Sequence, residues 1–291
     1  MTDLIDRLAD ISDIYDAVFC DLWGCLHNGV RPFPDAVAAL QQFRGNGGTV
    51  VLLTNAPRPK ASVVRQLDKI GVPHDAYDEV VSSGDASQYG MLTGLAGTKV
   101  YHLGPEKDSS FFTDLPTDIM GKDITRVPLD QAEGIICTGL FDDQTETPED
   151  YRATLLYAKQ KGMKLLCTNP DIVVDMGETR IYCAGAIAAL YSEMGGESLY
   201  FGKPHPQIYD LARRRLAAIK RAPDDRILAI GDGIHTDVQG GLAEGFDTLF
   251  ITGGLAAEEF GPDPSNPDPL LVQAWFKAHQ ISATAAIPYL R

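Results

Sequence analysis

Positive charge is scarce in this sequence. Its 25 lysine and arginine residues stand against 40 aspartate and glutamate residues, so the formal net charge is −15 at pH 7. This deficit argues against a nucleic-acid-binding surface and against an anionic membrane as partner, because both require clustered cations. A small phosphorylated ligand stays possible, since a metal ion and one lysine can make a locally positive pocket in an acidic protein.

Long apolar runs and paired cysteines are also missing. No stretch approaches the ~20 apolar residues that cross a bilayer. The first ten residues include three aspartates, which is unlike the basic and then apolar pattern of a secretory signal. The five cysteines are an odd number and include no Cys-x-x-Cys pair, so a disulfide framework is not expected. These absences predict a cytoplasmic protein with reduced thiols.

Short apolar segments alternate with helical patterns near both ends of the sequence. The predicted elements are, in chain order, a strand at 17–20, a helix ending at 43, a strand at 49–53, a helix at 60–70, a strand at 198–201, a helix at 206–221, and strands at 226–230 and 248–252. This alternation predicts an α/β fold with a doubly wound parallel sheet and right-handed crossovers.

A second unit of similar texture separates these two groups of elements. It has predicted strands at 99–103, 134–138 and 163–167, and predicted helices at 85–93, 148–161 and 184–194. We therefore predict a core domain formed by residues 1–83 and 198–291, with an inserted α/β domain of residues 84–197. At the start of the chain, the apolar stripe of Leu4, Ile5, Leu8 and Ile11 predicts an amphipathic helix over 1–16.

Polar residues follow four predicted strands. They are Asp21, the pair Thr54 and Asn55, Lys203, and the pair Asp232 and Asp237. The carboxyl ends of parallel strands meet at one edge of a sheet, so these residues are expected to converge. A nucleophile, a hydroxyl, a cation and two carboxylates for Mg²⁺ are the groups that phosphoryl transfer requires.

Each of these motifs also has a plain structural interpretation. Asp21 alone is typical of a turn, Thr54-Asn55 of a helix cap, and Lys203 of a surface lysine. Asp232 is more specific, because its two flanking glycines let a carboxylate reach a ligand without steric hindrance. His235 fits a turn better than a metal site, since no His or Cys lies at ligand spacing from it. The combination and its order carry the functional prediction.

The order of these motifs resembles the haloacid dehalogenase (HAD) superfamily over nearly the whole chain. The insertion between Asn55 and Lys203, with Thr-Asn-Pro-Asp at 168–171, resembles its class IIA branch, which includes phosphatases of sugar phosphates, 4-nitrophenyl phosphate and pyridoxal phosphate. The resemblance implies a HAD-like core, a cap domain that closes over the site, and a Mg²⁺-dependent hydrolase acting on a small phosphorylated metabolite through an aspartyl phosphate. It also implies a possible homodimer through the cap.

The resemblance assigns roles to individual residues. The implied catalytic residues are Asp21 as nucleophile, Thr54 on the transferring phosphate, Lys203 as the neutralising cation, and Asp237 as the anchor of Lys203 or of the metal's water shell. The implied metal ligands are Asp21, Asp232 and, through its backbone carbonyl, Trp23. The implied substrate contacts are Thr54, Asn55, the amide of Ala56, Lys203 and, from the cap, Asn169, Asp171 and Gly185.

One residue departs from the family pattern. Phosphatases of this superfamily have a second aspartate in the form Asp-x-Asp-Gly, and this chain has Trp23 in that place, in Asp-Leu-Trp-Gly. The missing carboxylate is the general acid that protonates the leaving oxygen, so its loss should lower the rate by about 10²–10⁴.

Three interpretations of Trp23 follow. In the first, a slow or specialised phosphatase takes its proton from His27 or from a cap residue, although a turn role suits His27 better. In the second, the chain performs the hydrolytic chemistry of HAD members that lack this acid, such as dehalogenases. In the third, it binds a phosphorylated ligand without catalysis, and Trp23 packs near that ligand.

Overall fold

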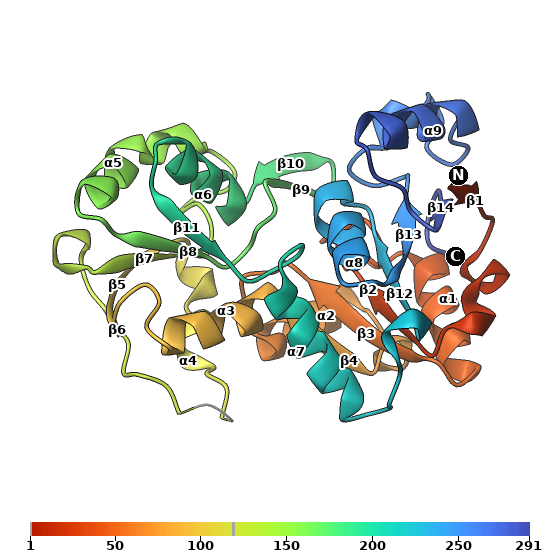
Figure 1. Cartoon of the computed structure of the whole chain (residues 1–291), viewed down its shortest axis with the longest axis horizontal. Coiled ribbons are helices and arrows are strands. Elements are labelled where there is room, and N and C mark those ends of the chain that lie inside the picture. The colour runs from red at the N-terminus through yellow and green to blue at the C-terminus, as the bar shows by residue number, and fades with distance from the viewer. Residues whose placement is uncertain (1, 118–119) are drawn as a thin grey trace.

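The computed structural model describes residues 2–117 and 120–291, and its main feature is two parallel β-sheets side by side (Figure 1). Residue 1 of the expected N-terminal helix and residues 118–119 of the expected inserted domain lie outside these ranges. None of the helices within them is both long and apolar enough to cross a bilayer. The expected α/β fold with a doubly wound parallel sheet is confirmed.

The first sheet has seven strands, and every neighbouring pair is parallel. Its strands are, in spatial order, β1 (Asp3–Leu4), β14 (Ala285–Ile287), β13 (Asp247–Ile251), β12 (Ile227–Gly231), β2 (Ala17–Cys20), β3 (Thr49–Thr54) and β4 (Glu79–Ser82). The chain order along the sheet reverses between β12 and β2, so the ends of these two strands lie at a switch point, where open α/β sheets bind their ligands.

The second sheet has five parallel strands. They are, in spatial order, β11 (Glu197–Tyr200), β8 (Lys164–Cys167), β7 (Gly134–Cys137), β5 (Lys99–Leu103) and β6 (Thr125–Arg126). An antiparallel hairpin, β9 (Val173–Met176) and β10 (Thr179–Tyr182), leaves this sheet and reaches toward the first one (Figure 1).

Helices cover both sheets. On the first sheet, α1 (Pro34–Gly45) and α2 (Lys60–Ile70) pack on one face, and α3 (Ser83–Leu92) and α7 (Pro206–Ala217) on the other. The remaining helices are α4 (Ser110–Thr113), α5 (Arg152–Gln160), α6 (Ala184–Glu193), α8 (Gln239–Ala243) and α9 (Pro269–Ala278). The α5–α6 pair packs on the second sheet, and α3 lies between the sheets, in contact with both β4 and β8.

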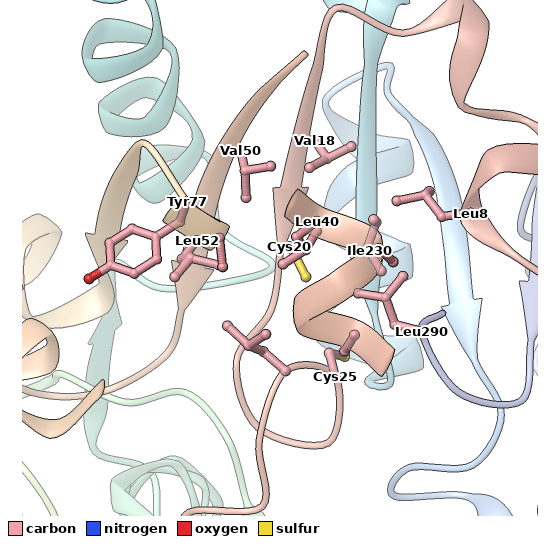
Figure 2. Close-up of a cluster of buried hydrophobic side chains, with 14 of the residues drawn as sticks. Leu8, Val18, Cys20, Cys25, Leu40, Val50, Leu52, Tyr77, Ile230 and Leu290 are labelled. Atoms are coloured by element: carbon pink, nitrogen blue, oxygen red, sulfur yellow. The ribbon is translucent and has the colours of Figure 1, made fainter. Parts of the chain in front are cut away.

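Strand β2 shows why the core forms as it does. All four of its residues are buried, which is typical of a parallel strand covered on both faces. Val18 and Cys20 point toward α1 and the cluster of Figure 2, and Ala17 and Phe19 point toward α7. Burying a Val or Phe side chain contributes about 1.5–3 kcal/mol, so β2 is fixed in place and the residue after it, Asp21, is fixed too.

Two expectations from the sequence are wrong. Residues 1–16 do not form a helix: β1 pairs with β14, and two short 3₁₀ turns follow at Leu8–Asp10 and Ser12–Ile14. The second error concerns β11, which was expected in the first sheet but pairs with β8 in the second. The proposed domain boundary at residue 198 therefore cuts through a strand of the second sheet. Both errors concern pairings between segments that are distant in sequence.

Candidate active site

A cavity of about 970 Å³ lies between the two sheets. From the first sheet it is lined by residues that follow β2, β12 and β13 and by the last residue of β3, and from the second sheet by residues that follow β5, β7 and β8. The β9–β10 hairpin covers it, because the Gly177 amide donates to the Asn28 carbonyl and the Arg180 guanidinium reaches the Leu255 carbonyl at 3.4 Å. The hairpin therefore bridges the cavity and contacts loops of the first sheet.

Asp21 and Lys203 form a buried ion pair at the floor of this cavity. The Lys203 ammonium lies 2.7 Å from Asp21 Oδ1 and 2.6 Å from Asp237 Oδ1, and the lysine is only 2% exposed. Burial raises the pKa of Asp21 to about 7, although the Lys203 charge acts in the opposite direction. The two carboxylates raise the pKa of Lys203 well above its ordinary value, so the lysine stays charged. Asp21 needs one further positive charge to be fully ionised.

Asp232 supplies a second carboxylate beside Asp21. Oxygens of both carboxylates and the Cys25 sulfur all lie within 4.8 Å of one another. Asp232 is 5% exposed, and burial next to Asp21 raises its pKa well above the ordinary value. The Leu255 amide donates to Asp232 Oδ2 at 2.9 Å. A Cβ on Gly24, which has φ +75°, would overlap the Asp232 carboxylate, so only glycine allows this approach.

These residues fit a divalent metal ion. Two buried carboxylates side by side are an unfavourable arrangement unless a cation lies between them, and burial and the charge of Asp21 raise the pKa of Asp232 accordingly. Carboxylate oxygens are the ligands that hard cations such as Mg²⁺ prefer. The Cys25 thiol is not one of these, and burial raises its pKa well above the ordinary value, so it stays neutral next to the carboxylates. The donor set therefore suits a hard cation better than a thiophilic one.

Thr54 and Asn55 have different surroundings, although they are neighbours. Thr54 lines the cavity at the end of β3, and its hydroxyl accepts a hydrogen bond from the Ala56 amide at 3.2 Å. Asn55 does not line the cavity. Its side chain accepts from the Lys203 amide at 2.7 Å and donates to the Asp171 carboxylate at 2.8 Å. The Asn55 side chain therefore links the loops of the two sheets.

The residues expected from the inserted unit also differ. Asn169 and Asp171 line the cavity, and the Asp171 amide donates to Asn169 Oδ1 at 3.0 Å. Burial raises the pKa of Asp171 to about 6. Gly185 is not among the cavity-lining residues, since its Cα faces the backbone of Pro170 and Asp171, where a Cβ would overlap both carbonyls. Gly185 therefore lets α6 pack on this loop, and the expectation that it faces the substrate is not met.

Trp23 lines the cavity, and His27 lies behind it. The two rings meet edge to face with centroids 5.3 Å apart. His27 is 1% exposed, its Nδ1 accepts from the Gly29 amide, and burial lowers its pKa to about 4. A neutral histidine outside the cavity lining cannot deliver a proton to a ligand there. His27 is a turn residue, and His235, which is exposed and close to Gln239, is also remote from the metal position.

Sequence reasoning missed three groups of the site. Cys25 lies beside the carboxylates, and no spacing rule points to it. Arg58 lines the cavity on the loop that begins at Thr54, so its position in that loop was a usable signal. Its partner Asp108 comes from the second sheet's loops, with 3.5 Å between Arg58 Nε and Asp108 Oδ1, and burial raises the Asp108 pKa to about 6. Nothing in the sequence singles out Asp108.

Comparison with known proteins agrees with this fold. Residues 18–116 match the family described as haloacid dehalogenase-like hydrolase, and residues 200–273 match that described as HAD-hydrolase-like. A crystal structure of a haloacid dehalogenase-like hydrolase from Brucella suis 1330 is 40% identical, with a TM-score of 0.85 over 99% of this chain and 100% of that chain.

Two further proteins are more distant. An acid sugar phosphatase from Staphylococcus haemolyticus is 25% identical over 84% of this chain and 88% of its own length. A structure described as a possible sugar phosphatase of the HAD superfamily, from Cytophaga hutchinsonii, is 19% identical, with a TM-score of 0.77 over 98% of this chain and 97% of that chain, and it shows the fold alone. The resemblance found in the motifs is thus confirmed, and the chain belongs to the haloacid dehalogenase-like hydrolases, in their class IIA branch.

Proposed function

We propose that this protein is a Mg²⁺-dependent phosphomonoesterase that uses Asp21 as its nucleophile. One observation carries the proposal: oxygens of Asp21 and Asp232 lie within 4.8 Å of each other, and the Lys203 ammonium lies 2.7 Å from Asp21. A nucleophile, a metal position and a fixed cation thus meet at one end of a large cavity. Relatives named as acid sugar phosphatase and 5'-nucleotidase support a phosphate ester as substrate.

The proposed reaction follows from the positions of these side chains. Asp21 and Asp232 would hold Mg²⁺, with Trp23 contributing its backbone carbonyl, and the ion would supply Lewis-acid stabilisation of charge on the phosphoryl oxygens. The carboxylate of Asp21 attacks phosphorus, and an aspartyl phosphate forms. Lys203, held by Asp237, neutralises charge between the nucleophile and the phosphate. The Thr54 hydroxyl and the Ala56 amide, from two residues that line the cavity, would contact the transferring phosphate.

The cavity suggests a small phosphorylated metabolite as substrate. Its volume of about 970 Å³ exceeds what a phosphate group needs and suits a sugar or aryl phosphate. Four cations at its wall, Arg58, Arg65, Lys69 and Lys107, would contribute to the binding of an anionic ligand together with Lys203 and the metal ion. The cap would exclude water during the reaction.

Trp23 favours a second candidate function, binding of a phosphorylated ligand without turnover. Its ring lines the cavity in the place where the family has an acid. A binder would be stabilised thermally by a phosphorylated ligand in the presence of Mg²⁺ and would release no phosphate.

A phosphate-release screen over sugar, aryl and nucleotide phosphates, with and without Mg²⁺, separates the two functions. We expect Mg²⁺-dependent release by the wild type and its loss by a factor of about 10³ or more in Asp21→Asn, because the amide cannot form the aspartyl phosphate. Asp175→Asn is the matched control, since this cavity-lining carboxylate is paired with Arg180 at 2.7 Å.

Two results would contradict the hydrolase proposal. One is the absence of phosphate release from every compound by both the wild type and Trp23→Asp, which restores the family acid. The other is equal activity of the wild type and Asp21→Asn, because the nucleophile would then lie elsewhere. Thermal stabilisation by a phosphorylated ligand without turnover would favour the binder.

A further inference from the structure

Hydrolysis of an unactivated phosphate ester needs a proton for the leaving oxygen, and Trp23 cannot supply it. Seven aspartates line the cavity among the residues that the structure describes: Asp21, Asp108, Asp143, Asp171, Asp175, Asp232 and Asp237. The proposed function uses three of them as nucleophile, metal ligand and lysine anchor. Four carboxyl groups therefore remain as candidates for the missing acid.

Three of these four are paired with a cation. Asp143 lies 2.8 Å from Lys107 Nζ, Asp175 lies 2.7 Å from Arg180 Nε, and Asp108 lies 3.5 Å from Arg58 Nε. A cation close to a carboxyl group favours its ionised form and hinders proton donation. The charges that act on Asp108 are those of Arg58, Lys107 and Asp143, none of which belongs to the nucleophile's end of the cavity.

Asp171 differs from these three carboxyl groups both in its hydrogen-bond partner and in its place in the cavity. Its Oδ1 accepts a hydrogen bond from a neutral group, the Asn55 amide, at 2.8 Å. The same Asn55 side chain accepts a hydrogen bond from the Lys203 amide at 2.7 Å, and the Lys203 ammonium lies 2.7 Å from Asp21, so Asp171 is held at the nucleophile's end of the cavity. It also comes from the second sheet's loop after β8, so it faces the nucleophile's sheet from the opposite side of the cavity.

We propose that Asp171 is the general acid and base of this enzyme and takes over the work of the aspartate that Trp23 replaces. The inference rests on the proposed phosphomonoesterase function and names the group that completes it. The Asn55 side chain fixes the position of this carboxyl, because Asn55 also accepts from the Lys203 amide at 2.7 Å. The proton donor from one sheet and the cation beside the nucleophile are thereby held by a single side chain.

The surroundings of Asp171 suit proton transfer in both directions. Burial raises its pKa to about 6, while the Lys203 charge and the Asn55 hydrogen bond act to lower it, and Asp237 acts to raise it. Asp21 and the thiols of Cys167 and Cys183 are other titratable groups near it, and burial keeps both thiols neutral by raising their pKa. A carboxyl group with a pKa near the working pH is the most effective acid and base for such transfers.

The proton balance closes over the two steps. In the first step an Asp21 oxygen bonds to phosphorus, the bond from phosphorus to the ester oxygen breaks, and that oxygen takes the proton of Asp171 and leaves as the alcohol. In the second step the Asp171 carboxylate takes a proton from a water molecule, whose oxygen attacks phosphorus. The bond to Asp21 breaks, inorganic phosphate leaves, and Asp171 is protonated again.

The test measures both steps in Asp171→Asn with an aryl and an alkyl substrate. With 4-nitrophenyl phosphate we expect a burst of about one nitrophenolate per enzyme at nearly the wild-type rate, followed by slow turnover, because this leaving group needs little protonation and only the second step needs the base. With glycerol phosphate we expect no burst and a first step slower by about 10²–10⁴. In the wild type the pH profile of kcat should report a group that titrates near pH 6, and Asp171→Asn should remove it.

Two controls keep the result interpretable. Asp108→Asn tests the other aspartate whose pKa is raised to about 6, and we expect it to keep the wild-type ratio of aryl to alkyl rates. Trp23→Asp in the Asp171→Asn background places a carboxyl group after β2, where the family has its acid. We expect this double variant to regain phosphate release from glycerol phosphate. Circular dichroism and thermal melting establish that each variant folds.

The outcomes separate this inference from the function on which it rests. If Asp171→Asn slows the aryl burst and the alkyl reaction by the same factor, Asp171 only positions the site and the inference is wrong, while the hydrolase proposal stands. The same holds if Asp108→Asn, and not Asp171→Asn, changes the aryl-to-alkyl ratio. If the wild type releases phosphate from neither substrate nor from any compound of the screen, the proposed function fails, and this inference fails with it.

Discussion

In both sheets of this molecule, strands end at the same cavity, but the residues at their carboxyl ends differ. In the first sheet, the strands that reach the cavity are followed by or end in Asp21, Thr54 and Asp232, side chains that can react, bind phosphate or hold a cation. In the second sheet, β5 and β7 are followed directly by uncharged residues, Gly104-Pro105 and Thr138-Gly139. The charged residues farther along these loops, Lys107, Asp108 and Asp143, line the cavity in ion pairs, Lys107 with Asp143 and Asp108 with Arg58.

This difference shows a division of work between the sheets. Strands β2, β3 and β12 of the first sheet are buried along their whole length, so the residues at their carboxyl ends are held rigidly enough for chemistry. Loops of the second sheet provide the opposite wall, which determines what fits. Asp171 and Lys203 are the exceptions, because both follow strands of the second sheet and both bind Asn55 of the first. The site is therefore complete only when the two sheets are held together.

Asp232→Asn should produce the largest effect among tests of this division. We expect phosphate release to fall by about 10³-fold, since Lewis-acid stabilisation of the transition state contributes several kcal/mol. Mg²⁺ should no longer raise the melting temperature. Without metal, the variant should melt higher than the wild type at pH 7 to 8, because the raised pKa of Asp232 shows that its ionised form is unfavourable there.

The matched control comes from the second sheet. Asp143→Asn also removes a carboxylate that lines the cavity, but one paired with Lys107 on the far wall. We expect its Mg²⁺-dependent thermal shift to equal that of the wild type. If Asp143→Asn lost the Mg²⁺-dependent thermal shift and Asp232→Asn kept it, the metal ion would bind to residues of the second sheet. The proposed difference between the two sheets would then be wrong.

Replacement of His27 should have an effect of intermediate size, on the pH dependence of stability. Its pKa is about 4 in the folded chain, against an ordinary value of 6.5, so the unfolded chain binds more protons between these values and stability falls as pH falls through them. At pH 5 the loss amounts to about 2 kcal/mol. We expect His27→Gln to unfold in urea with a weaker acid dependence below pH 6.5.

The exposed His279 is the control for this titration. His279→Gln makes the same substitution at an exposed histidine, and its unfolding is measured under the same conditions. An unchanged acid dependence in His27→Gln would mean that His27 is protonated in the folded chain, and its exclusion as a proton donor would then have to be withdrawn.

Thr138→Val should have the smallest effect. Thr138 follows β7, lines the cavity, and its hydroxyl makes a hydrogen bond with His102 Nε2 at 2.9 Å. Because it contacts the cavity wall and no reacting group, we expect the turnover rate to change less than about threefold and stability to fall by about 1 kcal/mol. Turnover slower by about two orders of magnitude, measured under saturating substrate, would show that the second sheet contributes chemistry beyond Asp171.

Local sequence patterns were sufficient for most of the fold and part of the site. The strand at 99–103 and the helix at 60–70 have the predicted bounds, because apolar periodicity reports which faces are buried. The convergence of Asp21, Thr54 and Asp232 could be predicted because it follows from one rule, that parallel strands end at one edge. Lys203 was predicted to reach the site from a strand of the first sheet, but that strand, β11, pairs with β8 in the second sheet.

The remaining errors concern interactions that no local pattern records. The apolar stripe at residues 4–11 suggested a helix, but Leu8 is buried in the core cluster and β1 finds its partner in β14. Nothing in the sequence indicates the three hydrogen bonds of the Asn55 side chain, two to the Lys203 backbone and one to Asp171. The neighbours of a side chain across a domain interface depend on tertiary packing, which spacing does not encode.

The pairing of β1 with β14 has a consequence for how the chain is made. Asp3 pairs with Ala285, and the Leu8 amide donates to the carbonyl of Arg291, so segments from opposite ends of the sequence close one edge of the first sheet (Figure 1). During synthesis β1 emerges long before its partner exists, and contacts between such distant residues form slowly. The nascent chain therefore holds an unpaired strand until β14 has been made, and removal of β14 would expose β13 as a new edge.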